Sequence, residues 1–288
     1  MRLGVSPFTT TRAGAQRVSA RAVDGGLDTL WLGDGLLVNP DFPGWSGAFE
    51  AFTELAWLAG QWPAARVGLT AAVLPLRDIV CLTRQAATLD RVTEGRFILA
   101  VAPGFWAKEL AWRGVPFEER GARFAEALAG LRAALAGEPF EGQYVRIPPG
   151  DRLAPEPHTP GGPPIWLAGG DATMRRALTL GLAYQASRIT PNALAPVAAR
   201  WHDGGGGLLA VRVRVEVKPA PPKGGTVAWQ GLAGPAAFLA EQLAGFADLG
   251  VADVSIVPGQ DDDTSLHTVG VLVDEVLPAL RAAGVSLD

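Results

Sequence analysis

An aromatic and an acidic residue that could serve chemistry follow directly after an apolar run at residues 97–102. The run ends at Pro103 and Gly104, Trp106 comes next, and Glu109 is the first acid beyond the break. A tryptophan in this place could lie over a flat ligand, and the carboxyl group of Glu109 could move a proton. The plainer interpretation of Glu109 is that it is a solvated residue on a helix.

Further polar residues stand just after other apolar runs. Asp34 follows residues 29–32, and it could face a ligand or make a structural hydrogen bond to a neighbouring loop. Ser6 ends the first run, at the amino terminus. Arg188 follows the run at 183–187; it could meet an anionic ligand, or pair with Asp171 or another acid.

A glycine turn at residues 169–171 opens a helical pattern. Gly169 and Gly170 precede Asp171 in the sequence LAGGDATMRRAL. Free backbone N–H groups at such a helix start could bind an anion. Alternatively, Asp171 caps the helix and the glycines only form the turn; the carboxylate of Asp171 would also repel a phosphate.

These residues need a scaffold that brings the ends of apolar runs together. Eight short apolar runs alternate with helical patterns, which predicts a parallel sheet covered on both sides. The simplest closure is a (β/α)8 barrel, whose ligand site lies at the C-terminal ends of the strands. A doubly wound open sheet would need a glycine-rich turn after its first strand, and the sequence there is SPFTTTRAGAQ. The predicted strands are 3–6, 29–32, 67–72, 97–102, 165–168, 183–187, 209–217 and 254–257.

Helices are predicted at 14–25, 47–61, 78–92, 118–136, 171–181, 191–202, 235–249 and 265–283. Between the helix at 118–136 and the strand at 165–168, the segment FEGQYVRI predicts a small hairpin, followed by a proline-rich connector. No linker interrupts the pattern, so residues 1–288 are expected to form a single α/β domain.

Composition excludes several classes of partner. The net charge is −4 and no cluster of Lys and Arg is present, so nucleic acid is not expected. No apolar run approaches the roughly 20 residues of a membrane span. Cys81 is expected to be a buried thiol rather than a disulfide or metal ligand, which fits a cytoplasmic location.

Metal and nucleophilic chemistry have no candidate residues. The three histidines are isolated, and none stands at metal-ligand spacing from Cys or carboxylates. The sequence has no GxSxG motif. An enzyme without metal or nucleophile usually uses an organic cofactor.

The sequence resembles the bacterial luciferase-like family, which comprises flavin- or F420-dependent oxidoreductases and monooxygenases on a (β/α)8 barrel. The resemblance rests on AVDGGLDTLWLGD (22–34), on PPIWLAGG (163–170), on GPAAFLAEQLAGFADLGV (234–251), and above all on LDRVTEGRFILAVAPGFWAKEL within residues 65–110. It implies FMN or coenzyme F420 across the barrel mouth, hydride or oxygen chemistry on a small organic substrate, and a homodimer.

The resemblance also implies roles for residues at the strand ends. Glu109 or Asp34 would handle the proton, and the end of strand three would form a backbone bulge that supports the cofactor ring. Residues implied to bind the cofactor are Ser6, Ala71, Ala72, Val73, Pro103, Gly104, Trp106, Gly169, Gly170, Asp171 and Arg188.

The chain departs from the family pattern at three places. Gly35 stands where many F420-dependent dehydrogenases have His, and Asp171 stands where relatives often have Ser or Thr. Tyr184 and Gln185 replace an acidic-Gly pair. The substrate therefore differs, or the chain has kept the fold and lost the reaction as a non-catalytic cofactor-binding barrel. A third reading, a lyase or aldolase, would need a Schiff-base lysine, and only Lys218 comes near.

Overall fold

The computed structural model describes residues 1–7, 11–38, 49–150, 152–187, 189–221, 226–227 and 231–287. It comprises two compact units. Unit 1 contains Met1–Leu32, Val38–Phe49 and Leu167–Asp288, and unit 2 contains Gly33–Leu37 and Glu50–Trp166. The expectation of a single domain stays a prediction.

The strand order is that of the predicted barrel. Eight strands follow one another in the order β9-β12-β1-β2-β3-β4-β7-β8, and β9 pairs with β8 as well as with β12, so these strands close into a ring. The fold class, a (β/α)8 barrel, is confirmed. The eight strands are β1 (Arg2–Val5), β2 (Thr29–Leu32), β3 (Arg66–Val73), β4 (Phe97–Ala102), β7 (Ile165–Ala168), β8 (Ala183–Ser187), β9 (Leu209–Val217) and β12 (Val251–Val257).

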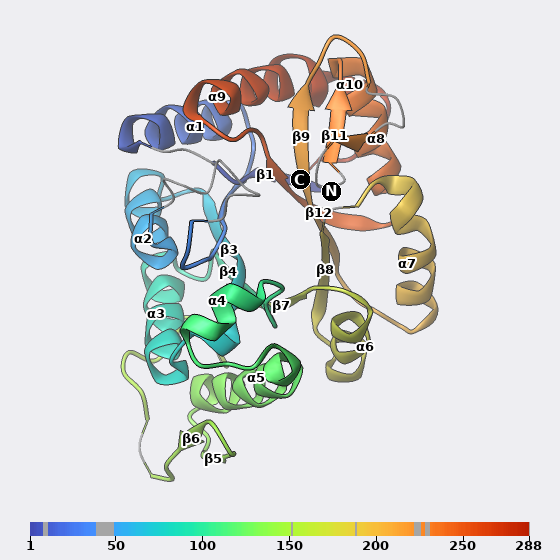
Figure 1. Cartoon of the computed structure of the whole chain (residues 1–288). Coiled ribbons are helices and arrows are strands. Elements are labelled where there is room, and N and C mark those ends of the chain that lie inside the picture. Colours follow the sequence, from blue (N-terminus) through green and yellow to red (C-terminus); the bar gives the residue numbers. More distant parts are fainter. Residues whose placement is uncertain are drawn as a thin grey trace. The chain divides into compact units, whose positions relative to one another are not determined.

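The helices follow the strands in the expected alternation (Figure 1). Unit 1 holds α1 (Arg12–Asp24), α6 (Asp171–Leu180), α7 (Pro191–Asp203), α8 (Ala236–Asp248), α9 (Asp262–Val271) and α10 (Leu277–Ala282), with a π-helical turn at Leu272–Val276. Unit 2 holds α2 (Ala51–Gln61), α3 (Ile79–Val92), α4 (Ala107–Trp112) and α5 (Arg120–Ala136), with 3-10 turns at Leu74–Leu76 and Phe117–Glu119. The short α4 was not predicted.

Unit 1 also carries two additional strands beside β9. β11 (Gly231–Gly234) pairs with β9 in parallel, and β10 (Thr226–Val227) pairs with β11 antiparallel. β9 itself alternates: Val211, Val213 and Val215 are buried, while the residues between them are half-buried. This alternation gives one apolar and one polar face.

Unit 2 is built on the parallel pair β3–β4. The register runs from Val67 opposite Phe97 to Val73 opposite Ala102, and it shifts between Leu69 and Ala72. This shift is the irregularity predicted at the end of strand three, and the Thr70–Ala71 peptide within it is cis.

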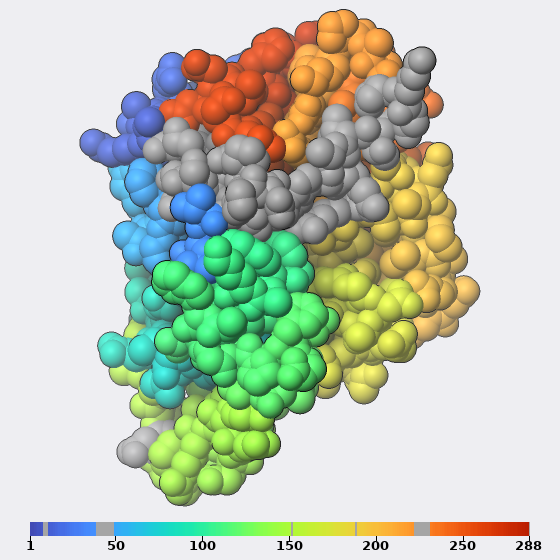
Figure 2. Space-filling model, viewed as in Figure 1, coloured from blue at the N-terminus to red at the C-terminus, as the bar shows by residue number. Residues whose placement is uncertain are grey.

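The predicted hairpin is also present in unit 2. β5 (Phe140–Glu141) pairs antiparallel with β6 (Arg146–Ile147). In Figure 1 it lies against α5, on the side of that helix away from α4. Figure 2 shows the same yellow-green segment projecting beyond the green surface of α4 and α5.

The expectation for Cys81 is wrong. Its side chain is exposed, because the inward face of α3 is formed by Ile79, Leu82 and Ala86, and residue 81 falls on the opposite side. A hydrogen bond with Asp78 raises the pKa of the thiol, and the Asp78 charge adds to this effect. No helix among the described residues is long and apolar enough to cross a membrane.

Candidate functional site

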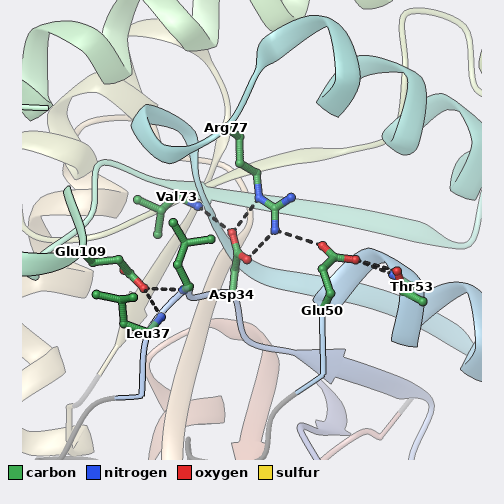
Figure 3. A network of polar contacts seen from close by, with 8 residues as sticks. Asp34, Leu37, Glu50, Thr53, Val73, Arg77 and Glu109 are labelled. Atoms are coloured by element: carbon green, nitrogen blue, oxygen red, sulfur yellow. Dashed lines mark hydrogen bonds and ion pairs between the residues drawn. The ribbon is translucent and has the colours of Figure 1, made fainter. Parts of the chain in front are cut away.

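Asp34 lies in unit 2, in the loop 33–37 that follows β2, and both of its carboxylate oxygens are engaged (Figure 3). Oδ2 accepts hydrogen bonds from Arg77 Nε at 2.8 Å and from the Val73 N–H at 3.2 Å. Oδ1 accepts from Arg77 Nη2 at 2.5 Å. The side chain of Asp34 is only 5% exposed, so this is a buried, bidentate ion pair.

Glu109 lies on α4 in the same unit and accepts hydrogen bonds from the same loop. Its Oε1 accepts a hydrogen bond from the Leu36 N–H at 2.5 Å and a longer one from the Leu37 N–H at 3.4 Å. The residue is 8% exposed, so its interpretation as a solvated helix residue is wrong. Burial raises the pKa of Glu109; the two N–H bonds oppose this rise, and the negative charge of Asp34 adds to it.

Apolar packing holds α4 in place and so positions Glu109. Leu110, the next residue on the helix, is buried in a cluster with Val73, Leu76 and Val115. Gly104 has φ +85°, and a Cβ there would lie 2.8 Å from Cγ1 of Val73. The loop after β4 therefore packs directly on the end of β3, and only glycine fits at this approach.

The residues predicted to support a ring are thus brought together in unit 2. Ala72 and Val73 are buried beside the register shift, and Ala71 and Pro103 are half-buried. Trp106 is the N-cap residue of α4 and is also half-buried. Lys108 Nζ lies 6.0 Å from the centre of its ring. The tryptophan therefore keeps part of its surface accessible.

Asp171 begins α6 in unit 1, but it does not cap that helix. The N-cap residue is Gly170, and no side chain caps the helix start. The carboxylate instead accepts hydrogen bonds from Arg200 Nη1 at 2.9 Å and Nη2 at 2.7 Å. Arg175 Nη1 lies 3.7 Å away. The hydrogen bonds from Arg200 lower the pKa of Asp171, although its partial desolvation opposes them.

Tyr184, one of the departures from the family pattern, supports the same turn. Its hydroxyl donates a hydrogen bond to the Gly169 carbonyl at 2.7 Å. Burial raises the pKa of Tyr184 to about 12, with a further contribution from the charge of Asp171. Gly169 has φ +155°, and a Cβ there would lie 2.6 Å from Oγ1 of Thr173. The turn is therefore closely packed at Gly169, whereas none of the described residues lies within 4 Å of a Cβ at Gly170.

Ser6 is fully buried in unit 1, at the end of β1. Its N–H donates to the Ile256 carbonyl at 2.7 Å. Its hydroxyl has no hydrogen-bond partner in the part of the chain that the structure describes. Arg188 lies outside the described residues.

A sequence model of the luciferase-like monooxygenase family matches residues 4–206, which is more than half of the chain. The chain belongs to this family. The resemblance inferred from the strand-end motifs is thereby confirmed, and the family comprises flavin- and F420-dependent monooxygenases and oxidoreductases.

Curated relatives match only part of this luciferase-like chain. Pyrimidine monooxygenase RutA of Yersinia enterocolitica is 30% identical over 166 residues, covering 54% of this chain and 44% of that protein. The oxygenase component of the flavin-dependent trigonelline monooxygenase of Acinetobacter baylyi is 27% identical over 151 residues, covering 51% and 40%. The aligned region thus spans about half the length of the curated relatives or less.

Solved structures share the fold over almost the whole chain. An F420-dependent secondary alcohol dehydrogenase, solved with an F420–acetone adduct, has a TM-score of 0.81 at 17% identity and covers 97% of this chain and 99% of its own. The oxygenating constituent of 3,6-diketocamphane monooxygenase from Pseudomonas putida, solved with FMN, has a TM-score of 0.75 at 15% identity, covering 96% and 98%. At these identities the likeness establishes the fold.

The residues of this luciferase-like chain fit a flavin-type group on chemical grounds. In unit 1, an uncapped helix start with open space above Gly170 suits a phosphate, because its N–H groups need an acceptor. The buried hydroxyl of Ser6 can donate a hydrogen bond to such a group. In unit 2, the residues predicted to line the ring are apolar or aromatic, and the buried carboxyl groups of Asp34 and Glu109 lie in the same unit.

Two arginines that pair with predicted acids, one in each unit, were not predicted from the sequence. Arg77 pairs with Asp34, and Arg200 pairs with Asp171, at separations of 43 and 29 residues. Arg188 was considered as a partner for Asp171 and lies outside the described residues; among the described residues Arg200 makes two hydrogen bonds with Asp171. No sequence signal connects such distant partners.

A third omission lies on β9. The segment VRVRVEV has strand periodicity, which places Arg212, Arg214 and Glu216 together on its polar face. Arg214 forms an ion pair with Glu216, and Lys218 Nζ lies 3.5 Å from Glu216 Oε2. The alternation alone could have revealed this face.

Proposed function

We propose that this chain is an oxidoreductase that uses reduced FMN or F420 to reduce or oxygenate a small organic substrate. The observation that carries the proposal is Glu109, a buried carboxyl group held by two backbone N–H groups beside the end of β3. Burial favours the protonated form of this group, which can present its proton to a reacting molecule.

The cofactor would supply a hydride or activate oxygen when bound. Ala71, Ala72 and Val73 would support one face of its ring, and the loop carrying Pro103, Gly104 and Trp106 would line the seat. Apolar and aromatic side chains there exclude water, which strengthens electrostatic interactions in the seat.

The two acids predicted to be catalytic have different electrostatic environments. Arg77 neutralises Asp34 and occupies both of its oxygens, so this carboxylate belongs to a structural ion pair. Burial favours the protonated form of Glu109. We therefore assign proton transfer to Glu109 and a structural role to Asp34.

The phosphate of the cofactor would bind at the start of α6. The backbone N–H groups at Gly170 and Asp171 would donate to it, and Ser6 would add a hydroxyl group elsewhere in unit 1. Arg200 would offset the charge of Asp171, which otherwise opposes an anion. This arrangement would bind the phosphate of either cofactor, so FMN and F420 are both candidates. The homodimer and the cytoplasmic location are further predictions for this chain.

The first experiment is to purify the protein, denature it, and identify any coloured small molecule that is released. If none is released, titration with oxidised and reduced FMN and F420 measures their dissociation constants. We expect micromolar or tighter binding of at least one. Failure of all four to bind at micromolar concentrations would refute the proposal.

Substitution of Glu109 by Gln tests the proton-transfer role. Gln keeps a carbonyl acceptor for the Leu36 and Leu37 N–H groups but cannot exchange a proton. With the substrate that the wild type turns over, we expect the rate to fall by about 10²- to 10⁴-fold, with cofactor affinity nearly unchanged. An unchanged rate would exclude Glu109 from this role.

A non-catalytic cofactor-binding barrel is the second candidate. Gly35 offers no acid or base, and the carboxylate of Asp34 is fully engaged. Its signature would be tight binding of FMN or F420 with no reduction or reoxidation by any substrate tested. Turnover with any substrate would rule it out.

A further inference from the structure

We propose that Arg77 is a positioning residue of this site: through Asp34 it holds the loop 33–37 against the end of β3, so that the backbone N–H groups of Leu36 and Leu37 face Glu109. The inference rests on the proposed function, because it concerns the carboxyl group to which proton transfer is assigned. Figure 3 shows two sets of contacts made by this loop: Asp34 with Arg77 and Val73, and the backbone at Leu37 with Glu109.

The link between Arg77 and Asp34 has a geometry that only arginine provides. Nε and Nη2 of the guanidinium donate to different oxygens of the carboxylate, at 2.8 and 2.5 Å. A lysine has a single nitrogen and cannot reproduce this two-point contact. The side chains of Arg77 and Asp34 are 15% and 5% exposed, so water cannot readily replace either partner.

Arg77 is itself held by its surroundings. Its N–H donates to the Leu74 carbonyl at 3.0 Å, which fixes the backbone just after β3. Its Nη2 lies 3.4 Å from Oε1 of Glu50, the N-cap residue of α2. The guanidinium carbon lies 4.9 Å from the ring centre of Phe52. The position of the guanidinium is therefore set before it meets Asp34.

The position of Asp34 affects two neighbouring parts of the structure, the end of β3 and the rest of the loop 33–37. Its Oδ2 also accepts from the Val73 N–H at 3.2 Å, which ties the loop to the β3 end proposed to support the ring. Two residues further along the loop, the N–H of Leu36 meets Glu109. Without Arg77, Asp34 would remain as a buried carboxylate with one backbone donor, and it would be expected to move toward water.

The charges around Glu109 make its ionisation a sensitive reporter of this movement. Asp34 is the charged group that acts on it from the loop, and its negative charge favours the protonated form. Lys108 on the same helix lies toward Trp106. On the 3-10 turn packed against α4, Glu119 is paired with Arg123, and Glu118 is exposed. Loss of Arg77 would unmask Asp34 and loosen the two N–H donors, and both changes favour the protonated form of Glu109.

The experiment uses the full chain without cofactor and compares Arg77→Gln, Arg77→Lys, Asp34→Asn and the Asp34→Asn/Arg77→Gln double variant. Infrared titration, with Glu109→Gln in the same background as the reference, isolates the carboxyl band of Glu109. The dissociation constants of FMN and F420 are measured in parallel. Arg21→Gln is the matched control, because it removes the ion pair in unit 1 between Arg21 on α1 and Asp274 on the π-helical turn Leu272–Val276.

We expect Arg77→Gln to raise the midpoint of the Glu109 titration by about one pH unit, and to weaken cofactor binding about tenfold or more. Arg77→Lys should move the midpoint in the same direction by a smaller amount, so it serves if Arg77→Gln does not fold. Because Arg77 acts through Asp34, the double variant should bind cofactor no more weakly than Arg77→Gln.

A Glu109 midpoint in Arg77→Gln equal to that of Arg21→Gln would overturn the inference. So would fully additive effects of Asp34→Asn and Arg77→Gln on the midpoint, since these would show that the two residues act independently. If the wild type binds neither FMN nor F420, the proposed function fails, whereas the infrared titration still decides the role of Arg77.

Discussion

Glu54 offers a quantitative test of the electrostatics of unit 2. It lies on α2, four residues after the N-cap residue Glu50, on the side of the helix that also buries Leu55 and Leu58. Its exposed fraction is 9%. Burial raises the pKa of Glu54 from 4.5 to about 7, and no hydrogen bond or cation reaches its carboxylate among the described residues.

The size of the effect follows from linkage between ionisation and folding. Between pH 4.5 and pH 7, folded Glu54 keeps a proton that the unfolded chain has released, so stability falls as pH rises through this window. At about 1.4 kcal/mol for each pKa unit, the loss reaches about 3 kcal/mol above pH 7. Below pH 4.5 the carboxyl is protonated in both states, and this contribution to the pH dependence disappears.

Glu54→Gln removes the ionisation while keeping a similar shape. Its free energy of unfolding, measured by urea denaturation, should therefore be close to that of the wild type at pH 4.5. At pH 8 the variant should be more stable by about 3 kcal/mol. The comparison between the two pH values cancels the packing difference between an amide and a protonated carboxyl group.

Glu50→Gln is the matched control, because it should show the opposite sign. Burial opposes ionisation of Glu50, but hydrogen bonds from Thr53 and the charge of Arg77 lower its pKa. Removal of the negative charge of Glu50 should lower the free energy of unfolding, and it should lower it more at pH 8 than at pH 4.5. If Glu54→Gln showed no gain between pH 4.5 and pH 8, the carboxyl group of Glu54 would have to be solvated or paired, and the reasoning would be refuted.

Two further outcomes test the packing and the phosphate seat. Leu110→Ala should lower the free energy of unfolding by about 2–5 kcal/mol and slow turnover, because Leu110 anchors α4 and hence Glu109. Urea denaturation measures the first effect and steady-state kinetics the second. An unchanged rate would show that α4 is held by other means. Asp171→Ser should strengthen binding of FMN relative to riboflavin, which lacks the phosphate, since Arg200 would then be free to face an anion; equal changes for both ligands would locate the phosphate elsewhere.

Patterns along the sequence were sufficient to predict the barrel. The runs at 29–32, 97–102 and 209–217 became strands with the same bounds, because apolar residues between turn signals leave few alternatives. The six-residue α4 escaped prediction because its length gives no periodicity to detect. Cys81 was misplaced because a largely apolar helix does not reveal which of its faces meets the sheet.

The sequence predicted the acids of the candidate site but not the arginines that neutralise them, because these partners are distant in the chain. Asp34 and Glu109 were found from their places after strands, but their different electrostatic states depend on Arg77 and on the backbone of Leu36. Likewise, the charge of Asp171 argued against a phosphate until the structure supplied Arg200. Position in a pattern predicts which residues meet, whereas their ionisation depends on three-dimensional neighbours.

Gly35 is best understood together with these two carboxyl groups. With no side chain at residue 35, the loop 33–37 offers no imidazole, and its groups that reach Glu109 are backbone N–H donors. N–H donors stabilise a carboxylate but cannot carry its proton away. A proton held by Glu109 would therefore have to pass directly to a reacting molecule or to water. On this basis the absence of a side chain at residue 35 is compatible with the proposed proton transfer from Glu109.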